Sequence, residues 1–188
     1  MHHRRSIRLK GFDYSSEGGY FITLVTHERQ PLFGEVIDGE MRLSELGVIA
    51  RDEWFRTSQM RHYVELFEDE FVVMPNHIHG IIWITDHPDR WGSDSHRWGT
   101  ARRAPTRETP TNVEQFGKPV SGSIPTIVRS YKSAITKRVN ELRATPSSPV
   151  WQRNYYEHII GFDHEYDAIV EYIHSNPMNW AKDDEYNP

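Results

Sequence analysis

Short runs of apolar, β-branched and aromatic residues recur along the chain, and such runs are typical of β-strands. They predict strands or extended segments at residues 19–27, 31–43, 63–73, 77–85 and 150–160. Within 31–43, the dipeptide Asp38-Gly39 is typical of a tight hairpin turn. The runs before and after Pro75-Asn76 are predicted to pair as antiparallel strands.

Three other segments carry apolar residues at helical spacing. They are residues 44–60, 125–143 and about 164–176. Ser44 is a candidate N-cap of the first, and Pro177 marks the end of the third. In the second, the side chains expected to face inward are Ile127, Val128, Tyr131, Ala134, Ile135 and Leu142. Helices and strands together predict an α+β fold, with a central antiparallel sheet and helices packed against it.

Composition narrows the class of protein. The 188 residues suffice for a core without cross-links, and we expect a single domain over residues 1–188 with a long variable loop at about 86–122. The chain has no cysteine, which excludes disulfides, thiolate metal sites and thiol nucleophiles. No apolar run approaches the roughly 20 residues that span a bilayer. No apolar signal core follows the N-terminus, so we expect a cytoplasmic protein with no membrane partner.

The charge is unevenly distributed. A net charge of −5 and a pI near 6.1 argue against a nucleic-acid binder. Residues 1–10, however, carry four basic side chains and no acid, and residues 97–143 carry ten Lys or Arg against three Glu. Such segregation can leave one basic face on an acidic protein. The alternative is a solvated loop followed by an ordinary charged helix face.

A pair of histidines stands out in residues 74–80, MPNHIHG. Successive strand residues point to opposite faces, so His77 and His79 should project from the same face, away from Ile78. Two neighbouring imidazoles are half of a site for a divalent metal. The simpler alternative is two partly exposed histidines on an open sheet face.

A second candidate group lies on the last predicted helix. Tyr172 and Asn176 are four residues apart and therefore share a helix face. Together they offer a phenol that can act as a nucleophile and a carboxamide oxygen that can bind a metal. The alternative is a tyrosine packed at the helix edge and an asparagine near the helix C-terminus.

Several segments together resemble one protein family. They are YFITLVT at 20–26, MPNHIHG at 74–80, SYKSA at 130–134, WQRNYYEH at 151–158, EYI at 171–173 and Asn176-Pro177. In this order and spacing they resemble the HUH (His-hydrophobic-His) single-tyrosine transposases of the insertion-sequence type, and most of all the REP-associated tyrosine transposases. The resemblance runs from about Arg5 to Trp180, with a variable stretch near 86–122.

This resemblance implies a ferredoxin-like HUH endonuclease fold and a DNA strand-transfer reaction. Tyr172 would attack a phosphodiester in single-stranded DNA, giving a 5′-phosphotyrosine link and a free 3′-hydroxyl. His77 and His79, with Asn176 one helical turn past the tyrosine, would hold the metal. The family implies Mg²⁺ or Mn²⁺, and because imidazole suits Mn²⁺ better than Mg²⁺, Mn²⁺ satisfies both arguments.

The partner that the resemblance implies is single-stranded or hairpin DNA from palindromic sequences. The expected phosphate contacts come from the basic stretches, at Arg4, Arg5, Arg8, Lys10, Arg102, Arg103, Arg129, Lys132 and Arg138. Trp91 and Trp98 can stack on unpaired bases or pack loosely in the loop, and neither alternative is favoured. The sequence leaves monomer and homodimer open.

Some assignments stay open at this point. By chemistry alone Tyr155 and Tyr156 compete with Tyr172 as the nucleophile, and the resemblance decides for Tyr172. We expect most of the aromatic residues from Trp151 to Tyr156 to close the core beneath the last helix. His158 is either a core histidine or part of the site.

Two other functions are compatible with the same residues. One is a domesticated protein that binds DNA hairpins without cutting them. The other is a metal-dependent phosphodiesterase that uses water, whose cleavage would survive the substitution Tyr172→Phe.

Overall fold

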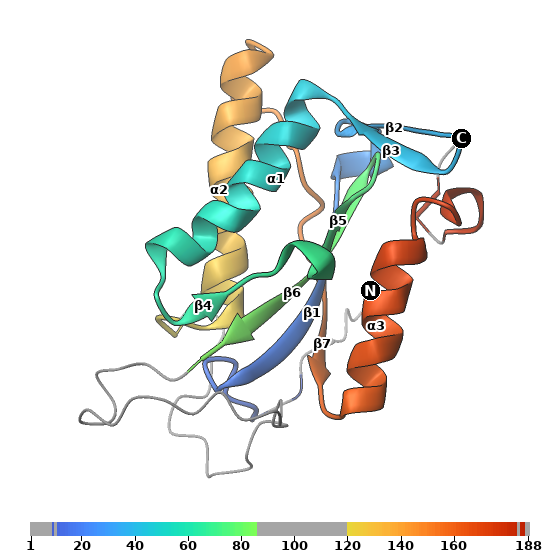
Figure 1. The fold of residues 1–188 in the computed structure, drawn as a ribbon. Coiled ribbons are helices and arrows are strands. Elements are labelled where there is room, and N and C mark those ends of the chain that lie inside the picture. The colour runs from blue at the N-terminus through green and yellow to red at the C-terminus, as the bar shows by residue number, and fades with distance from the viewer. Residues whose placement is uncertain (1–8, 10, 86–119, 184, 187–188) are drawn as a thin grey trace, which may run out of the picture.

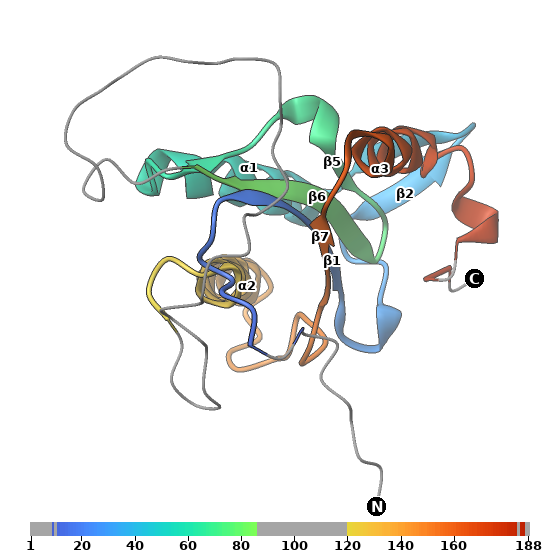
Figure 2. The same cartoon turned by 90° about the horizontal axis from the view of Figure 1, so that it is seen from below.

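The computed structural model describes residue 9 and residues 11–85, 120–183 and 185–186. Figures 1 and 2 show a sheet with helices on both of its faces. The strands are β1 Gly18–Val25, β2 Gly34–Ile37, β3 Glu40–Leu43, β4 Val64–Glu65, β5 Phe71–Val73, β6 His77–Ile84 and β7 Tyr156–Ile160. The helices are α1 Glu45–Met60, α2 Ile124–Leu142 and α3 Asp163–Ser175, with 3-10 turns η1 His27–Arg29, η2 Glu68–Glu70 and η3 Trp180–Lys182. This is the predicted α+β class.

The main sheet is antiparallel, with strand order β4-β6-β1-β7, and β5 also pairs with β6. β1 and β6 pair along their full lengths, so that His79 lies opposite Thr23 and His77 opposite Val25. On the other side of β1, Thr23 lies opposite Tyr156 of the edge strand β7. His79, Thr23 and Tyr156 therefore form one row across three strands.

One face of the sheet is covered by α1 and α2, which pack against each other (Figure 1). The larger apolar core lies on this face and includes Ile78 and Ile82 of β6, Trp54 of α1 and Tyr131 of α2. Gly80 lets α1 come close, because a Cβ there would lie 2.4 Å from the Trp54 ring. The hydroxyl of Tyr131 donates to the backbone oxygen of Ala50 at 2.9 Å, which ties α2 to α1.

The opposite face is covered by α3 (Figure 2). A smaller apolar cluster joins Phe21, Ile81 and Ile160 of the sheet to Ile173 of the helix. No other residue of α3 is fully buried in the part of the chain described. Helix α3 is therefore held by a small contact, and much of its length borders solvent.

The predicted hairpin and the first helix are confirmed at their key residues. β2 and β3 pair around Asp38 and Gly39, whose φ angles of +53° and +78° are those of a hairpin turn of the predicted kind. Ser44 caps α1, because its hydroxyl oxygen accepts a hydrogen bond from the Gly47 amide at 3.2 Å.

Two local predictions are wrong. The strand expected at 63–73 is divided into β4 and β5 by η2, whose last residue, Glu70, turns its carboxylate into the protein. Leu142 was expected to face inward but is 48% exposed, because it lies in the last turn of α2, where the helix extends beyond the sheet (Figure 1). In the part of the chain that the structure describes, no helix is long and apolar enough to cross a membrane.

Candidate functional site

The two histidines lie side by side on the α3 face of the sheet. Both are buried, and their ring centroids are 4.4 Å apart. The Nδ1 of His77 donates to the side-chain oxygen of Asn76 at 2.9 Å, and the Nδ1 of His79 lies 2.8 Å from the hydroxyl of Thr23. A hydrogen bond at Nδ1 fixes the ring and leaves Nε2 for a ligand.

Burial keeps both imidazoles neutral at pH 7. It lowers the pKa of His77 to about 4, although Asp183 and Glu185 act in the opposite direction. Burial also lowers the pKa of His79 well below its usual value, and the neighbouring His77 lowers it further. Neutral imidazole is the form that binds metals, so no proton has to be displaced from these rings.

Helix α3 brings Tyr172 and Asn176 to the histidines. The hydroxyl of Tyr172 lies 3.2 Å from Nε2 of His79, and its side chain is 43% exposed. Asn176 is buried, and its Nδ2 donates to Asp183 at 2.9 Å. The four residues that the sequence selected from two distant segments thus lie within one small site.

Asp183 is a member of this site that the sequence did not reveal. Its carboxylate also accepts a hydrogen bond from the Tyr172 hydroxyl at 3.3 Å. One donor atom from each of Asp183, His77 and His79 lies within 4.8 Å of the others. The segment is held in place because Glu185 pairs with Arg29 of η1 at 2.6 Å.

The donor set fits a divalent metal. Among the residues described, Nε2 of His77 and Oδ1 of Asn176 are buried atoms with no hydrogen-bond partner. Buried polar atoms are normally paired, so two unpaired acceptors in one site indicate a ligand that both can bind. Two imidazole nitrogens with amide and carboxylate oxygens suit Mn²⁺ or another first-row divalent ion.

The basic residues of α2 are not brought to this site, since α2 lies on the other face of the sheet (Figure 1). Lys132 donates to the backbone oxygens of Gln152 at 2.5 Å and Asn154 at 3.3 Å, and burial lowers its pKa to about 8. Arg138 pairs with the buried Glu53 at 2.7 Å. The side chain of Arg129 is exposed.

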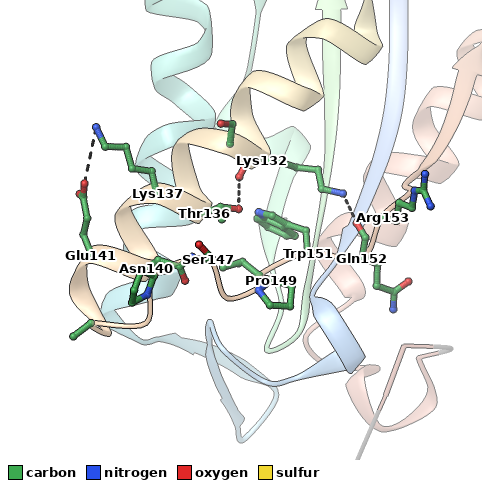
Figure 3. A pocket seen from close by; sticks show the side chains of 14 residues that line it. Lys132, Thr136, Lys137, Asn140, Glu141, Ser147, Pro149, Trp151, Gln152 and Arg153 are labelled. Atoms are coloured by element: carbon green, nitrogen blue, oxygen red, sulfur yellow. Dashed lines mark hydrogen bonds and ion pairs between the residues drawn. The ribbon is translucent and has the colours of Figure 1, made fainter. Parts of the chain in front are cut away.

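A groove of about 840 Å³ lies between α2 and the segment that precedes β7. Figure 3 shows the side chains that line it, with Lys132 pointing toward Gln152. This groove and the histidine pair therefore lie on different faces. The remaining predicted DNA contacts and loop aromatics lie outside the described residues: Arg4, Arg5, Arg8, Lys10, Arg102, Arg103, Trp91 and Trp98.

The aromatic cluster before β7 divides between the two faces. Trp151 is buried against Phe33 and Tyr131, on the α2 side and not beneath α3 as expected. Tyr155 packs partly buried against the same core. Most of these aromatic residues were expected to close the core, and Tyr156 is the one that does not. It is 45% exposed on the α3 side, the face opposite to the larger core.

His158 is half-buried on the same face as Tyr156. Its Nε2 lies 2.5 Å from the carboxylate of Glu165, which also accepts from the Gly161 amide. His158 is thus a surface histidine bound to α3, two residues along β7 from the row that contains His79.

Comparison with known proteins gives the following relatives. No family model matches the chain. An uncharacterized protein of Haemophilus influenzae is 39% identical over 186 residues, which is 99% of this chain and 94% of that protein.

Two solved structures match this chain. The structure of a REP-associated tyrosine transposase bound to a REP hairpin matches with a TM-score of 0.52 at 19% identity, over 96% of this chain and 74% of that one. A candidate transposase from Deinococcus radiodurans matches with a TM-score of 0.46 at 16% identity, over 90% of this chain and 96% of that one. The first match shows that this chain shares the fold of that REP-associated tyrosine transposase.

Proposed function

Because this chain belongs to one family with the Haemophilus protein and has the fold of a REP-associated tyrosine transposase, we propose that it is a metal-dependent single-stranded DNA endonuclease and strand transferase. It would act through a 5′-phosphotyrosine intermediate on hairpin or palindromic DNA. The observation that supports this most directly is the 3.2 Å separation between the Tyr172 hydroxyl and Nε2 of His79, residues 93 positions apart in the chain. The REP hairpin in the neighbouring structure supports this class of substrate.

The metal ligands that we propose are Nε2 of His77, Nε2 of His79 and Oδ1 of Asn176. The unpaired state of the first and third of these atoms supports the assignment. A bound Mn²⁺ or Mg²⁺ would polarise the scissile phosphate and stabilise charge on the leaving oxygen. The carboxylate of Asp183 lies close enough to both imidazoles to complete the ligand set.

In the first step, the phenolic oxygen of Tyr172 bonds to phosphorus and the bond from phosphorus to the 3′ oxygen breaks. The 3′ oxygen leaves with the electron pair and takes up a proton. With a pKa near 10, a free tyrosine is only about 0.1% phenolate at pH 7, so the phenol needs a proton acceptor. Asp183, which already accepts the hydroxyl hydrogen bond, is placed for that role. The reverse reaction with a 3′-hydroxyl rejoins the strand.

The experiment that tests this function uses labelled single-stranded hairpin oligonucleotides, taken from repeats flanking the protein's own gene, with Mn²⁺. We expect a covalent protein–DNA band on a denaturing gel, and we expect Tyr172→Phe to abolish it. Tyr155→Phe is the matched control and should retain the band. Cleavage without the band would favour the water-using phosphodiesterase, and binding without cleavage would favour the domesticated hairpin binder.

A further inference from the structure

A continuous group of aromatic rings leads from the histidine pair to the surface. The ring of Phe21 stacks on His79, with centroids 5.5 Å apart and planes 19° apart. The same ring meets the edges of Tyr172 and Tyr156, each at 6.2 Å. Phe21 is buried, so Tyr156 is the ring of this group that solvent reaches on the β7 side.

The sheet register fixes the distance of Tyr156 from the proposed metal ligands. Thr23 lies opposite both His79 and Tyr156, so these two residues are separated by two strand spacings, or about 10 Å. β7 is an edge strand with no pairing partner on its outer side among the described strands. A nucleotide next to a phosphate held at the histidines therefore has an open approach to the ring.

The surroundings of Tyr156 are compatible with a DNA strand. On this face, the carboxylate of Glu165 of α3 is contacted by His158 of β7 and accepts a hydrogen bond from the Gly161 amide. His158 is half-buried and lies two residues along β7 from Tyr156. The tyrosine ring thus stands between the catalytic group and a histidine, and Glu157, the next residue of β7, points to the opposite face of the sheet.

We propose that Tyr156, oriented by Phe21, forms a subsite that stacks an unpaired nucleobase next to the scissile phosphodiester. This inference rests on the proposed function, since it names how the same site holds its substrate. An aromatic face stacks on any base that is not already paired and stacked in a duplex. The subsite therefore selects single-stranded over double-stranded DNA at the cleavage position without reading its sequence.

The experiment measures binding in the non-cleaving Tyr172→Phe protein with Mn²⁺. The probe is a single-stranded hairpin oligonucleotide that carries 2-aminopurine on either side of the cleavage position mapped with the wild-type protein. We expect quenching of 2-aminopurine at one flanking position. Adding Tyr156→Ala should weaken binding roughly 5- to 100-fold and remove the quenching.

Substitutions at the same position separate stacking from other roles. Tyr156→Phe and Tyr156→Trp keep an aromatic face and should keep the quenching. Phe67→Ala is the matched control, because Phe67 is 38% exposed before η2 and lies outside the site, and it should leave binding unchanged. A loss with Tyr156→Phe equal to that with Tyr156→Ala would assign the effect to the hydroxyl and overturn the proposal.

The outcomes distinguish this inference from the proposed function. If the wild-type protein forms the covalent band while Tyr156→Ala neither weakens binding nor removes quenching, the subsite is refuted and the function stands. If the wild-type protein cuts the strand without forming the band but the quenching depends on the ring at position 156, the phosphotyrosine function fails and the subsite stands. If the wild-type protein forms no band and the Tyr172→Phe protein binds no single strand, both are refuted.

Discussion

The two faces of the central sheet differ in what their side chains do. On one face, α1 and α2 bury residues such as Ile78 and Ile82 in a large apolar core. On the other, α3 covers only a small apolar cluster, and beside it lie two neutral buried histidines, an unpaired amide oxygen and a phenol. The first face supplies the burial that stabilises the fold, and this allows the second to hold polar groups that cost stability.

The difference between the two faces is sharpest within β6, where the adjacent residues Ile78 and His79 point to opposite faces. A substitution on the α3 face should lower the reaction rate with little change in the free energy of unfolding. A substitution on the α2 face should lower the free energy of unfolding with little change in the reaction rate of the folded protein. The predictions below test this separation, beginning with the largest expected effect.

If His79 holds a metal as proposed, His79→Asn should lower the rate of covalent adduct formation by roughly 10²- to 10³-fold, because the metal that would stabilise charge on the leaving oxygen loses one ligand. The rate is measured on denaturing gels at saturating DNA, and Mn²⁺ affinity by calorimetry. His62→Asn, in the exposed segment between α1 and β4, is the matched control and should react at the parent rate. A normal rate with His79→Asn would remove the metal centre from the mechanism.

Ile78→Ala should lower the free energy of unfolding by about 2–5 kcal/mol, because it leaves a cavity in the larger core. Chemical denaturation measures this change. At a temperature where the variant is folded, its adduct rate per folded molecule should match the parent. A selective loss of reaction in a folded Ile78→Ala protein would contradict the separation of the two faces.

The stability of the metal-free protein should fall as the pH drops from about 6.5 toward 4. In that range the unfolded chain protonates His77, whereas burial lowers its pKa to about 4 in the folded protein. The unfolded state then binds more protons, and the difference is worth about 3 kcal/mol at the lower end. Denaturation at several pH values in EDTA should give a flatter profile for His77→Asn, and identical slopes would show that this histidine does not contribute.

Lys132→Met should cost about 1–3 kcal/mol of stability, because the ammonium of Lys132 donates to two backbone oxygens before β7. Arg129→Met, which removes an exposed charge from the same helix, should change stability by no more than about 0.5 kcal/mol. Thermal denaturation compares the two. If Lys132→Met leaves stability unchanged but weakens DNA binding, Lys132 contacts DNA, as the sequence suggested, and does not stabilise the fold.

Much of the fold was predictable because strand and helix periodicities are local. Asp38-Gly39 and Ser44 specify a turn and a cap through their own backbone preferences. The break at η2 was not predictable, because the inward turn of Glu70 depends on partners in β6 and α3 that the local pattern does not contain. Leu142 follows the helical stripe, but the end of the sheet that leaves it exposed is set by tertiary packing.

The sequence predicted two pairs of site residues separately, but it did not predict the complete site. Spacing placed His77 with His79 and Tyr172 with Asn176, and the family resemblance joined the pairs. Asp183 carries no periodic or motif signal, and its contact with the site depends on the path of the chain after α3. The exposure of Tyr156 follows from the register of β7, which the sequence of an aromatic cluster does not determine.

The buried carboxylate of Glu70 accepts hydrogen bonds from the indole of Trp83 on β6 and the phenol of Tyr166 on α3, each at 2.6 Å. It therefore holds α3, whose side chains are mostly not buried, against the sheet at a point almost two turns before Tyr172. If these hydrogen bonds are lost, α3 can move away from the sheet. The observed reaction rate then scales with the fraction of molecules in which α3 is packed on the sheet. Glu70, although far from the Tyr172 hydroxyl, would in this way set the fraction of molecules in which the site is assembled.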